Sequence, residues 1–541
     1  MKLTKLVTIL SAIMLIFSCQ DKKTSKNKSV KPNIVFIMSD DHAYQAISAY
    51  DNTLIETPNI DRIAKEGMLF ENATVTNSIC APSRAVILTG KHSHINGKID
   101  NLSKFDTNNV TFPQILQKAG YQTAMVGKWH LGHAQQTYHP NNRGFEHFYG
   151  HLHTEVGFYP PFANQGGKDF QLNGESIEAD GYETFLLADE ATRYIRERDK
   201  TKPFFMYMPF IAPHTPLDAP QELQDKYKDI NTDLRPARSE QTDSTRRISK
   251  LLMQKSARPM YAAVVDAMDQ AVMRVLKTLD AENISDNTIV LFFSDNGGAA
   301  YSVGGADNHP LRGGKGETFE GGIRVISLIR WPGKIPAGSK LDHIMTAMDV
   351  FPTLADAAGV KAENNFPLDG SSLWQSISSD KPAPRDEYVF FASETPIYGH
   401  FNLTVFNDEW KLVQEVEQDQ LTTTVTNHLF QISDDPNEYN NLAPTHPDKV
   451  EELAERIRDW RALYPISGTR SQLIPPPGWR APLDWASYPI PIADLQEQTA
   501  PGMAPSPMIN RVLDMQHGER GRLVYDCETK WYLGGLCAQN K

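Results

Sequence analysis

The sequence predicts an α/β fold in which a large, mostly parallel sheet is flanked by helices and a smaller antiparallel-sheet subdomain follows near the C-terminus. From Asn33 onward, apolar runs of strand length alternate with helical segments, a pattern typical of a mainly parallel sheet. Near residue 385 the pattern changes to short strands that follow one another in antiparallel style. The 541 residues exceed what one core usually holds, so we expect one large domain and one smaller one.

Polar and potentially reactive side chains follow four of the predicted strands directly. These are Asn33 to Met38 before Asp40 and Asp41, Thr123 to Val126 before Lys128 and His130, Phe204 to Met208 before His214, and Thr288 to Phe293 before Asp295 and Asn296. In open α/β sheets, ligands bind at the carboxyl ends of the strands. The sequence therefore predicts one functional site at this edge, built from four distant segments.

The C-terminal part of the chain is expected to hold the smaller subdomain. Strands are predicted at Glu387 to Ala392, Phe401 to Phe406 and Trp410 to Val413, and a closing helix at Asp448 to Trp460. The residues that follow are proline-rich and irregular. We therefore predict a catalytic domain at 32–385, an α+β subdomain at 386–465 and a C-terminal extension at 466–541.

The N-terminal residues are typical of an export signal. Basic residues precede an apolar run from Leu6 to Phe17, which is too short to span a bilayer as a helix. Ile16 to Cys19 resembles a bacterial lipobox, so we expect a signal peptide at 1–18, a lipid on Cys19 and a lysine-rich tether at 19–31. A plain secretory signal is the alternative. The predicted location is the periplasm, the outer membrane or the cell surface, with membrane contact through the N-terminal lipid alone.

Charge and cysteine content narrow the classes of function. The formal net charge of -12 argues against a nucleic-acid-binding protein, whose surface would be basic. An anionic substrate is still compatible, because a few basic side chains can form a local binding pocket. In an exported chain, Cys527 and Cys537 are expected to form a disulfide, and two free buried thiols are the alternative.

The run from Cys80 to Gly90 carries the most specific motif in the chain. Cys80-Ala81-Pro82-Ser83-Arg84, followed by Thr89-Gly90, matches the pattern C-x-P-S-R-x-x-x-x-T-G without a gap. It resembles the signature of type I, formylglycine-dependent sulfatases of the alkaline phosphatase superfamily. The resemblance implies the mixed sheet of that superfamily, and it implies that a maturase oxidises Cys80 to formylglycine (3-oxoalanine) before the chain folds. A lone cysteine at the head of a helix would otherwise be a small buried apolar residue.

Four oxygen-bearing side chains predict a metal site. Asp40, Asp41, Asp295 and Asn296 supply three carboxylates and one amide oxygen from two strand ends. Such hard ligands suit calcium or magnesium and are poorly suited to zinc. The resemblance implies that they hold a single ion, usually Ca²⁺ with Mg²⁺ as the alternative, together with the modified Cys80.

The resemblance also assigns roles to five basic residues. Arg84 lies one helical turn after the modified cysteine and would neutralise its deprotonated form. Lys128 and His130 lie two apart in an extended segment and would face the same side, the first contacting the sulfate and the second accepting a proton as sulfate leaves. His214 and Lys315 would bind the bridging oxygen, and one of them would be the general acid toward the leaving alcohol.

The stretch from Gly304 to Lys315 looks most like the arylsulfatase B branch of the family. That likeness implies a carbohydrate sulfate ester as substrate, from an algal polysaccharide such as ulvan or carrageenan or from a glycosaminoglycan. His309 lies where relatives carry substrate-facing residues, so it is a candidate for substrate binding beside Lys128, His214 and Lys315.

Three other functions compete with this interpretation. One is hydrolysis of small aryl sulfates, and another is phosphomonoester or phosphonate hydrolysis within the same superfamily. The third is a catalytically inactive, glycan-binding lipoprotein, which is disfavoured because every expected catalytic residue type is present.

Overall fold

The computed structural model describes residues 31–463, with gaps at 45, 51–54, 102, 104, 133–135, 155, 161–168, 231–256, 300–304, 362–366, 380, 382–386, 396–399 and 419–422. Several predictions about the two ends of the chain therefore lie outside the described residues. They concern the signal peptide, the lipid on Cys19, nearly all of the tether, the pair Cys527 and Cys537, and the extension at 466–541.

The central sheet has ten strands in the described part of the chain, in the order β11-β2-β10-β9-β1-β8-β4-β5-β6-β7. Their bounds are β1 Asn33–Ser39, β2 Met68–Phe70, β4 Gln122–Lys128, β5 His147–His151, β6 Gln171–Leu172, β7 Glu175–Ser176, β8 Phe204–Pro209, β9 Thr288–Ser294, β10 Ser327–Arg330 and β11 Ser339–Leu341. β1, β4, β5, β8 and β9 are parallel, whereas β10 and β6 run antiparallel to their neighbours. Every residue of β1 and β9 is buried, which explains why both strands are continuous apolar runs.

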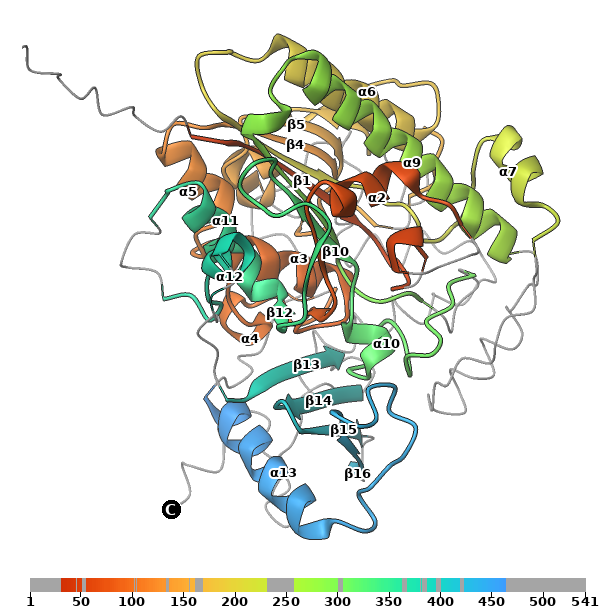
Figure 1. The fold of residues 1–541 in the computed structure, drawn as a ribbon, viewed down its shortest axis with the longest axis vertical. Coiled ribbons are helices and arrows are strands. Elements are labelled where there is room, and N and C mark those ends of the chain that lie inside the picture. Colours follow the sequence, from red (N-terminus) through yellow and green to blue (C-terminus); the bar gives the residue numbers. More distant parts are fainter. Residues whose placement is uncertain are drawn as a thin grey trace, which may run out of the picture. The chain divides into compact units, whose positions relative to one another are not determined.

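Helices cover both faces of this sheet (Figure 1). In β1, Ile34, Phe36 and Met38 enter one hydrophobic core, and Val35 and Ile37 enter another, as the alternation of side chains along a strand requires. The first core is covered by α3 Cys80–Thr89, α5 Phe112–Lys118, α11 Val350–Ala357 and α12 Trp374–Ser379, and the second by α2 Pro58–Lys65, α6 Glu183–Glu197, α7 Gln221–Tyr227 and α9 Ala257–Ala281.

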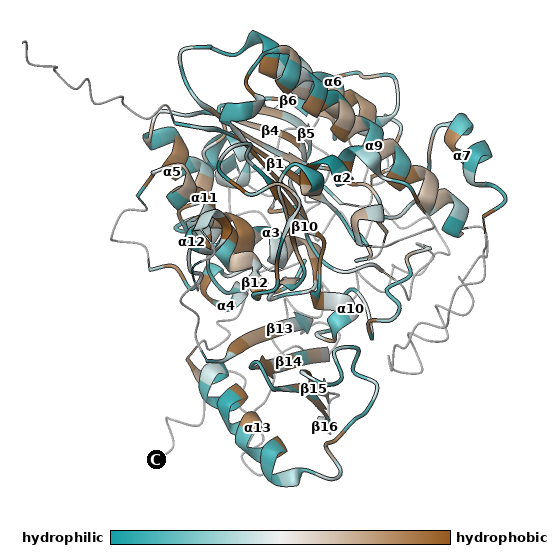
Figure 2. Cartoon of the chain, viewed as in Figure 1, coloured by the Kyte–Doolittle hydropathy of each residue, from teal (hydrophilic) through white to brown (hydrophobic). Residues whose placement is uncertain are grey.

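The hydropathy of the elements follows this layering. Figure 2 shows mostly hydrophobic residues in the central strands and a mixture of hydrophobic and hydrophilic residues along α6 and α9. The mixture is expected of helices that bury one side against a sheet and expose the other to water.

The C-terminal subdomain is a four-stranded antiparallel sheet with one long helix. Its strands are β13 Val389–Thr395, β14 His400–Phe406, β15 Trp410–Gln418 and β16 Thr423–Gln431, paired in sequence order, and the helix is α13 Pro447–Ala462. Leu403, Leu412 and Leu429 of the sheet pack with Leu453 and Ile457 of the helix. The smaller elements are β3 Ala73–Thr74 paired with β12 Met345–Thr346, α4 Ser93–Asn96, α10 Glu320–Ile323, and 3₁₀ helices at Ser48–Tyr50, Gln136–Tyr138, Pro140–Asn142, Ser285–Asn287 and Ala347–Asp349.

The predicted fold class is confirmed, with differences at the C-terminal subdomain. The sequence pattern did not predict β16, because its first half is threonine-rich and only partly buried, so no continuous apolar run marks it. From Pro32, the described residues form one compact unit, and the boundary expected at 385 stays a prediction. None of the described helices combines the length and the apolar content that crossing a membrane requires.

A fully buried lysine joins the C-terminal subdomain to the catalytic domain. The Nζ atom of Lys411, in β15, forms ion pairs with Oε1 of Glu320 and with Oε1 of Glu438, at 2.7 Å each. The Oε2 atom of Glu438 also accepts the backbone N–H of Glu320 at 2.9 Å. Burial alone would raise the pKa of Glu320, but the charges of Lys411 and Arg324 lower it to about 2. This cluster therefore holds the start of α10 through charge as well as packing.

A second buried cluster joins α13 to α4. The Nε atom of Arg461 donates to Glu394 Oε1 at 2.8 Å, and the Nε2 atom of His94 lies 2.8 Å from Glu394 Oε2. Burial alone would raise the pKa of Glu394, but the charges of Arg461 and His94 lower it to about 2.

Lys411→Met should lower the free energy of unfolding by about 3–5 kcal/mol, because it leaves buried carboxylates without their shared cation. Urea unfolding followed by tryptophan fluorescence measures the change. The control is Lys449→Met, since Lys449 forms an exposed pair with Glu452. It should change stability by less than about 0.5 kcal/mol. Equal small effects of both substitutions would show that the Lys411 cluster does not hold the subdomain.

Acid should weaken the contribution of Glu394 in a defined pH range. The pKa of Glu394 is about 2 in the folded protein. A glutamate of the unfolded chain titrates near about 4.3, so the stabilisation is complete above that pH and is lost as pH falls toward 2. The difference in unfolding free energy between wild type and Glu394→Gln should therefore shrink over this range by an amount on the order of 3 kcal/mol. A difference that does not change with pH would contradict the assignment.

Candidate active site

The register of the central strands brings the predicted acidic residues together. β1 and β9 pair in parallel with Ser39 opposite Ser294, so Asp40 and Asp295 leave the sheet side by side. The backbone N–H of Asp295 donates to Ser39 O at 3.1 Å, and that of Asp41 donates to Asp295 Oδ1 at 3.2 Å. Two strand ends that are far apart in the sequence thus form one acidic edge.

The guanidinium of Arg84 holds this edge in place. Its Nη2 atom donates to Asp295 Oδ2 at 2.8 Å and to Asp40 Oδ2 at 2.9 Å. Its Nε donates to Asp295 Oδ2 at 3.0 Å, and its Nη1 to the Lys128 carbonyl at 3.0 Å. Burial alone would raise the pKa of Asp40, but the charges of Lys128 and Arg84 hold it well below its ordinary value. Burial and the charge of Asp40 raise the pKa of Asp295.

Within the described part of the chain, two oxygen atoms at this edge have no hydrogen-bond partner. They are Asp40 Oδ1 and Asn296 Oδ1, both buried. The Nδ2 atom of Asn296 donates to Asp41 Oδ1 at 2.8 Å and to the Gly297 carbonyl at 2.9 Å, which leaves its Oδ1 as a free ligand atom. Buried oxygens without partners are costly unless an ion or water satisfies them. The donor set therefore fits one hard divalent cation.

The metal-competent cluster differs slightly from the predicted one. Asp40, Asp41, Cys80 and His214 each offer a ligand atom within 4.8 Å of the others. Asp295, by contrast, directs its carboxylate at Arg84 and at the Asp41 amide. The structure thus brings all the predicted ligands to one place and adds His214 beside them.

Cys80 is the first residue of α3 and is fully buried. Its Sγ lies 3.8 Å from Asp41 Oδ1. Pro82 fits the first turn of the helix, where backbone N–H groups have no partner within the helix, and Gly90 ends the helix with φ +65, which glycine adopts without strain. Burial and the charge of Asp40 raise the pKa of the Cys80 thiol well above its ordinary value. The unmodified residue is therefore a protonated thiol and a poor nucleophile.

Lys128 ends β4 and His130 follows it at the same edge, and both are buried. The Nζ atom of Lys128 contacts Asp40 Oδ2 and donates to Thr154 Oγ1 at 2.8 Å. Burial and the charge of Lys128 lower the pKa of His130 well below its ordinary value, so its imidazole is neutral and can accept a proton. His130 has a left-handed φ of +59, so the segment is not the regular extended chain that the sequence predicted.

His214 and Lys315 lie side by side over Asp41. The Nζ atom of Lys315 is 2.9 Å from Asp41 Oδ2 and 3.2 Å from His214 Nε2. The Nδ1 atom of His214 contacts the Thr215 carbonyl, which makes Nδ1 the protonated nitrogen and leaves Nε2 as the acceptor. Burial lowers the pKa of His214 despite the nearby charge of Asp41. The pair therefore offers one protonated amine and one neutral imidazole.

His309, the remaining predicted residue, and two other histidines make separate contacts. His309 is partly exposed, and its backbone N–H donates to Asp307 Oδ1 at 3.0 Å, so its role in substrate binding stays a prediction. His42 is buried against Ser39, and burial lowers its pKa to about 3. His428 pairs with Glu415 at 2.7 Å.

Thr154 is a contact of the site that the sequence analysis missed. Its hydroxyl accepts from Lys128 Nζ, but it belongs to no motif and follows β5, whose end was not among the predicted strand ends. The parallel register of β4 with β5, Lys128 opposite His151, would have pointed to it.

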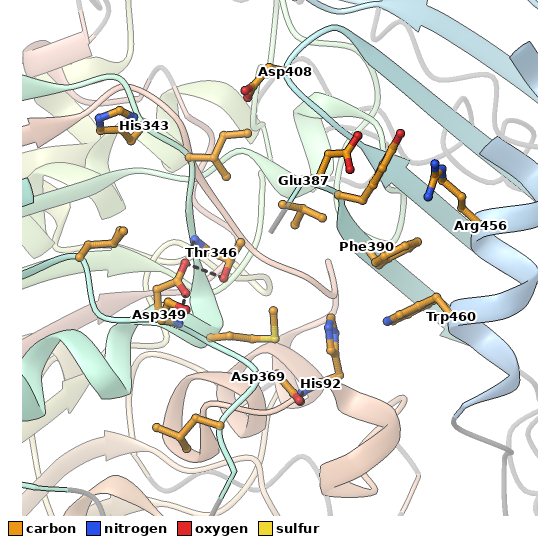
Figure 3. A pocket seen from close by; sticks show the side chains of 17 residues that line it. His92, His343, Thr346, Asp349, Asp369, Glu387, Phe390, Asp408, Arg456 and Trp460 are labelled. Atoms are coloured by element: carbon orange, nitrogen blue, oxygen red, sulfur yellow. Dashed lines mark hydrogen bonds between the residues drawn. The ribbon is translucent and has the colours of Figure 1, made fainter. Parts of the chain in front are cut away.

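A separate cavity of about 740 Å³ lies away from these residues (Figure 3). It contains His92, just past the Gly90 end of α3, whereas Cys80 begins the helix. Ten residues of helix span about 15 Å, so the cavity is at the far end of α3 from the candidate site. The lining holds one arginine, Arg456, and four carboxylates, an acidic balance that disfavours an anion. These carboxylates are Asp349, Asp369, Glu387 and Asp408.

Comparisons with known proteins give matches over most of the chain. Residues 32–360 match the Sulfatase family model, and residues 315–462 match the model described as N-sulphoglucosamine sulphohydrolase, C-terminal. The chain is 30% identical over 536 residues to the N-acetylglucosamine-6-O-sulfatase of Bacteroides thetaiotaomicron, covering 84% of this chain and 90% of that protein.

Solved structures are similar over most of the chain. Ps i-CgsB in complex with k-i-k-neocarrahexaose has a TM-score of 0.69 at 29% identity, covering 87% of this chain and 100% of that one. BT4656 in complex with its substrate D-glucosamine-2-N,6-O-disulfate has a TM-score of 0.67 at 28% identity, covering 80% of this chain and 98% of that one.

Titration of chelator-treated protein with Ca²⁺ or Mg²⁺ should reveal one saturable site. Asp40→Asn removes the charge of one ligand. It should therefore weaken cation binding by more than the roughly 10–100-fold loss that substitutions outside the ligand shell cause. Isothermal titration calorimetry measures both affinities. Asp225→Asn, on the exposed face of α7, is the control and should leave the affinity unchanged. Equal affinities of wild type and Asp40→Asn would mean that these residues do not hold the ion.

Proposed function

This chain belongs to the sulfatase family, whose members hydrolyse sulfate esters, and we propose that it removes sulfate from a carbohydrate by way of a modified Cys80. One observation carries the proposal. Cys80 lies within 4.8 Å of a cation-binding set of carboxylates and of His214, and Lys315 contacts that set at 2.8 Å. Sulfate-ester hydrolysis needs a nucleophile, charge neutralisation and proton transfer at a single point, and this cluster can supply all three.

The state of Cys80 supports its conversion to formylglycine. As a buried thiol of raised pKa it would be a weak nucleophile. A formylglycine at this position would supply a hydrated aldehyde, with one oxygen to attack sulfur and a second hydroxyl to help expel sulfate. Because the side chain is 0% exposed in the fold, a maturase would have to reach it before folding is complete.

Asp40, Asp41, Asp295 and Asn296 would hold one Ca²⁺, or Mg²⁺ as the alternative, beside residue 80. Their carboxylate and amide oxygens are the ligands that these ions prefer, and two of the oxygens are otherwise without partners. A divalent ion supplies charge neutralisation for the sulfate oxygens and orientation for the nucleophile. Lys128 and Arg84 add fixed positive charge at the same edge.

The proton transfers can be assigned to the chain's own residues. Lys315 carries a proton close to His214 Nε2, so this pair can deliver one to the bridging oxygen as the alcohol leaves. His130 is buried with a lowered pKa, so it is suited to accept a proton from the second hydroxyl as sulfate is released. Departure of the alcohol requires an acid, and release of sulfate requires a base. Separate environments allow the two groups to have these different protonation states.

The relatives support a carbohydrate as the alcohol component of the sulfate ester. The Bacteroides thetaiotaomicron relative is named for N-acetylglucosamine 6-O-sulfate, and the two solved structures hold a neocarrahexaose and a glucosamine disulfate. We therefore propose a sulfated glycan, from an algal polysaccharide such as carrageenan or from a glycosaminoglycan. We also propose export, with a lipid on Cys19, which would place the enzyme where such glycans are met.

Sulfate release from a panel of ulvan, carrageenan, fucoidan and chondroitin, as polymers and oligosaccharides, tests the function. Wild type should release sulfate from one class, whereas Cys80→Ala should be at least about 10³-fold slower because its nucleophile is missing. Ion chromatography measures the sulfate, and mass spectrometry of the tryptic peptide from Glu66 to Arg84 reports the state of Cys80.

Controls separate the reaction from its competitors. Matched phosphate esters should release far less phosphate than the glycans release sulfate. Fully converted wild type that acts only on small aryl sulfates would overturn the glycan assignment, and equal rates for wild type and Cys80→Ala would overturn the role of Cys80.

A further inference from the structure

The backbone after β5 supports Lys128 and His130. The N–H of Trp129 donates to His151 O at 2.9 Å, and the N–H of His130 donates to Leu152 O at 3.1 Å. Thr154, at the end of the same stretch, accepts from Lys128 Nζ at 2.8 Å. Residues 151–154, the support segment, therefore set where both basic side chains lie.

The support segment is itself held by one buried carboxylate. Among the described residues, β6 pairs with β5 at Tyr149 and Gly150 and not beyond, so no described strand lies on that side of the next amides. Asp169 takes the place of that strand: its Oδ1 accepts the N–H of Leu152 and its Oδ2 accepts the N–H of His153, each at 2.9 Å. Asp169 is 1% exposed, so water does not compete for these bonds.

The backbone of His130 needs such support. Its φ of +59 lies in the left-handed region, which a residue with a side chain adopts only when its surroundings hold it there. The bond from its N–H to Leu152 O is one of those restraints, and the position of Leu152 depends in turn on Asp169. A change at Asp169 would therefore reach His130 through the backbone without touching the reacting atoms.

Asp169 carries a charge for this task. Burial raises its pKa to about 6, while the nearby His151 and the two amide hydrogen bonds oppose that rise. It is ionised at neutral pH, and hydrogen bonds to a carboxylate are stronger than those to a neutral acceptor. A neutral side chain of the same shape would hold the segment less firmly.

We infer that Asp169 is a positioning residue for the reaction: by binding the amides of Leu152 and His153 it fixes the segment on which His130 and Lys128 rest. The inference rests on the proposed function in that His130 is taken to accept a proton as sulfate is released. Loss of the restraint should then slow sulfate release more than the earlier departure of the alcohol.

Asp169→Asn tests this with little change of shape. An amide has one acceptor oxygen and directs an NH₂ group at the other backbone N–H, so one bond is replaced by a clash of donors. The kcat should fall about 10–100-fold, as a small displacement of a catalytic group causes, and KM should fall with it, so that kcat/KM changes by less than about threefold because only the step after departure of the alcohol is slowed. With a fluorogenic sulfate ester, a burst of about one alcohol per active site should precede slow turnover. The control is Asp180→Asn, an exposed aspartate further along the chain, which should match wild type.

Two readouts do not depend on turnover. Divalent-cation affinity and the conversion of Cys80 should be unchanged in Asp169→Asn, whereas hydrogen exchange at the amides of Leu152 and His153 should be faster than in wild type. In wild type itself, these two amides should exchange far more slowly than those of the exposed stretch around Asp180. The exchange rates in wild type test whether Asp169 holds the support segment, even when the Asp169→Asn variant does not fold.

The outcomes separate the two proposals. If wild type with converted Cys80 releases no sulfate, the proposed function fails, and the exchange data still decide whether Asp169 holds the segment. A kcat within about twofold of wild type would overturn the inference. So would a burst that shrinks in proportion to kcat, because that indicates fewer folded molecules, and so would fast exchange of both amides in wild type.

Discussion

The rest of the site depends on burial of the Arg84 guanidinium between Asp40 and Asp295. Through these contacts and the Lys128 carbonyl, one side chain of α3 ties together the ends of β1, β9 and β4. A buried guanidinium is tolerated only when its donors are paired, and these acceptors receive four hydrogen bonds from its five N–H groups. These bonds occupy Oδ2 of Asp40 and leave its Oδ1 available to an ion. The arginine of the C-x-P-S-R motif therefore organises the cluster of carboxylates beside which the cysteine of that motif lies.

Opposite charges are matched in number at this edge, which explains how an acidic protein can bind an anion. Three carboxylates face three cations in the candidate site, namely Asp40, Asp41 and Asp295 with Arg84, Lys128 and Lys315. A divalent ion added to this balance makes the site net positive, and an anionic sulfate ester offsets that charge. The cavity of Figure 3 has an excess of carboxylates in its lining, so it is the poorer site for sulfate.

The C-terminal subdomain helps to anchor the loop that carries Lys315. Lys411 pairs with Glu320, which begins α10, and the Gly321 amide that follows donates to the Arg312 carbonyl at 2.6 Å in the loop that carries Lys315. The structure gives the segment around Glu438 a supporting role, since Glu438 shares Lys411 with Glu320. Loops that carry catalytic groups need such anchoring, because they lack the ladder of hydrogen bonds that fixes a strand.

The sequence by itself determined the α/β class, the four strand ends and the residue types that meet there, because apolar runs and the motif around Cys80 are local properties of the chain. It also placed Asp40, Asp41, Asp295 and Asn296 in one set, and all four lie at one edge. Only the tertiary structure decided the parallel register that puts Asp40 beside Asp295, the left-handed backbone of His130, and the supporting roles of Thr154, Asp169 and Lys411. These features depend on contacts between residues distant in the chain whose side chains belong to no motif, and a backbone dihedral or a buried ion pair is stable only in the packing that surrounds it.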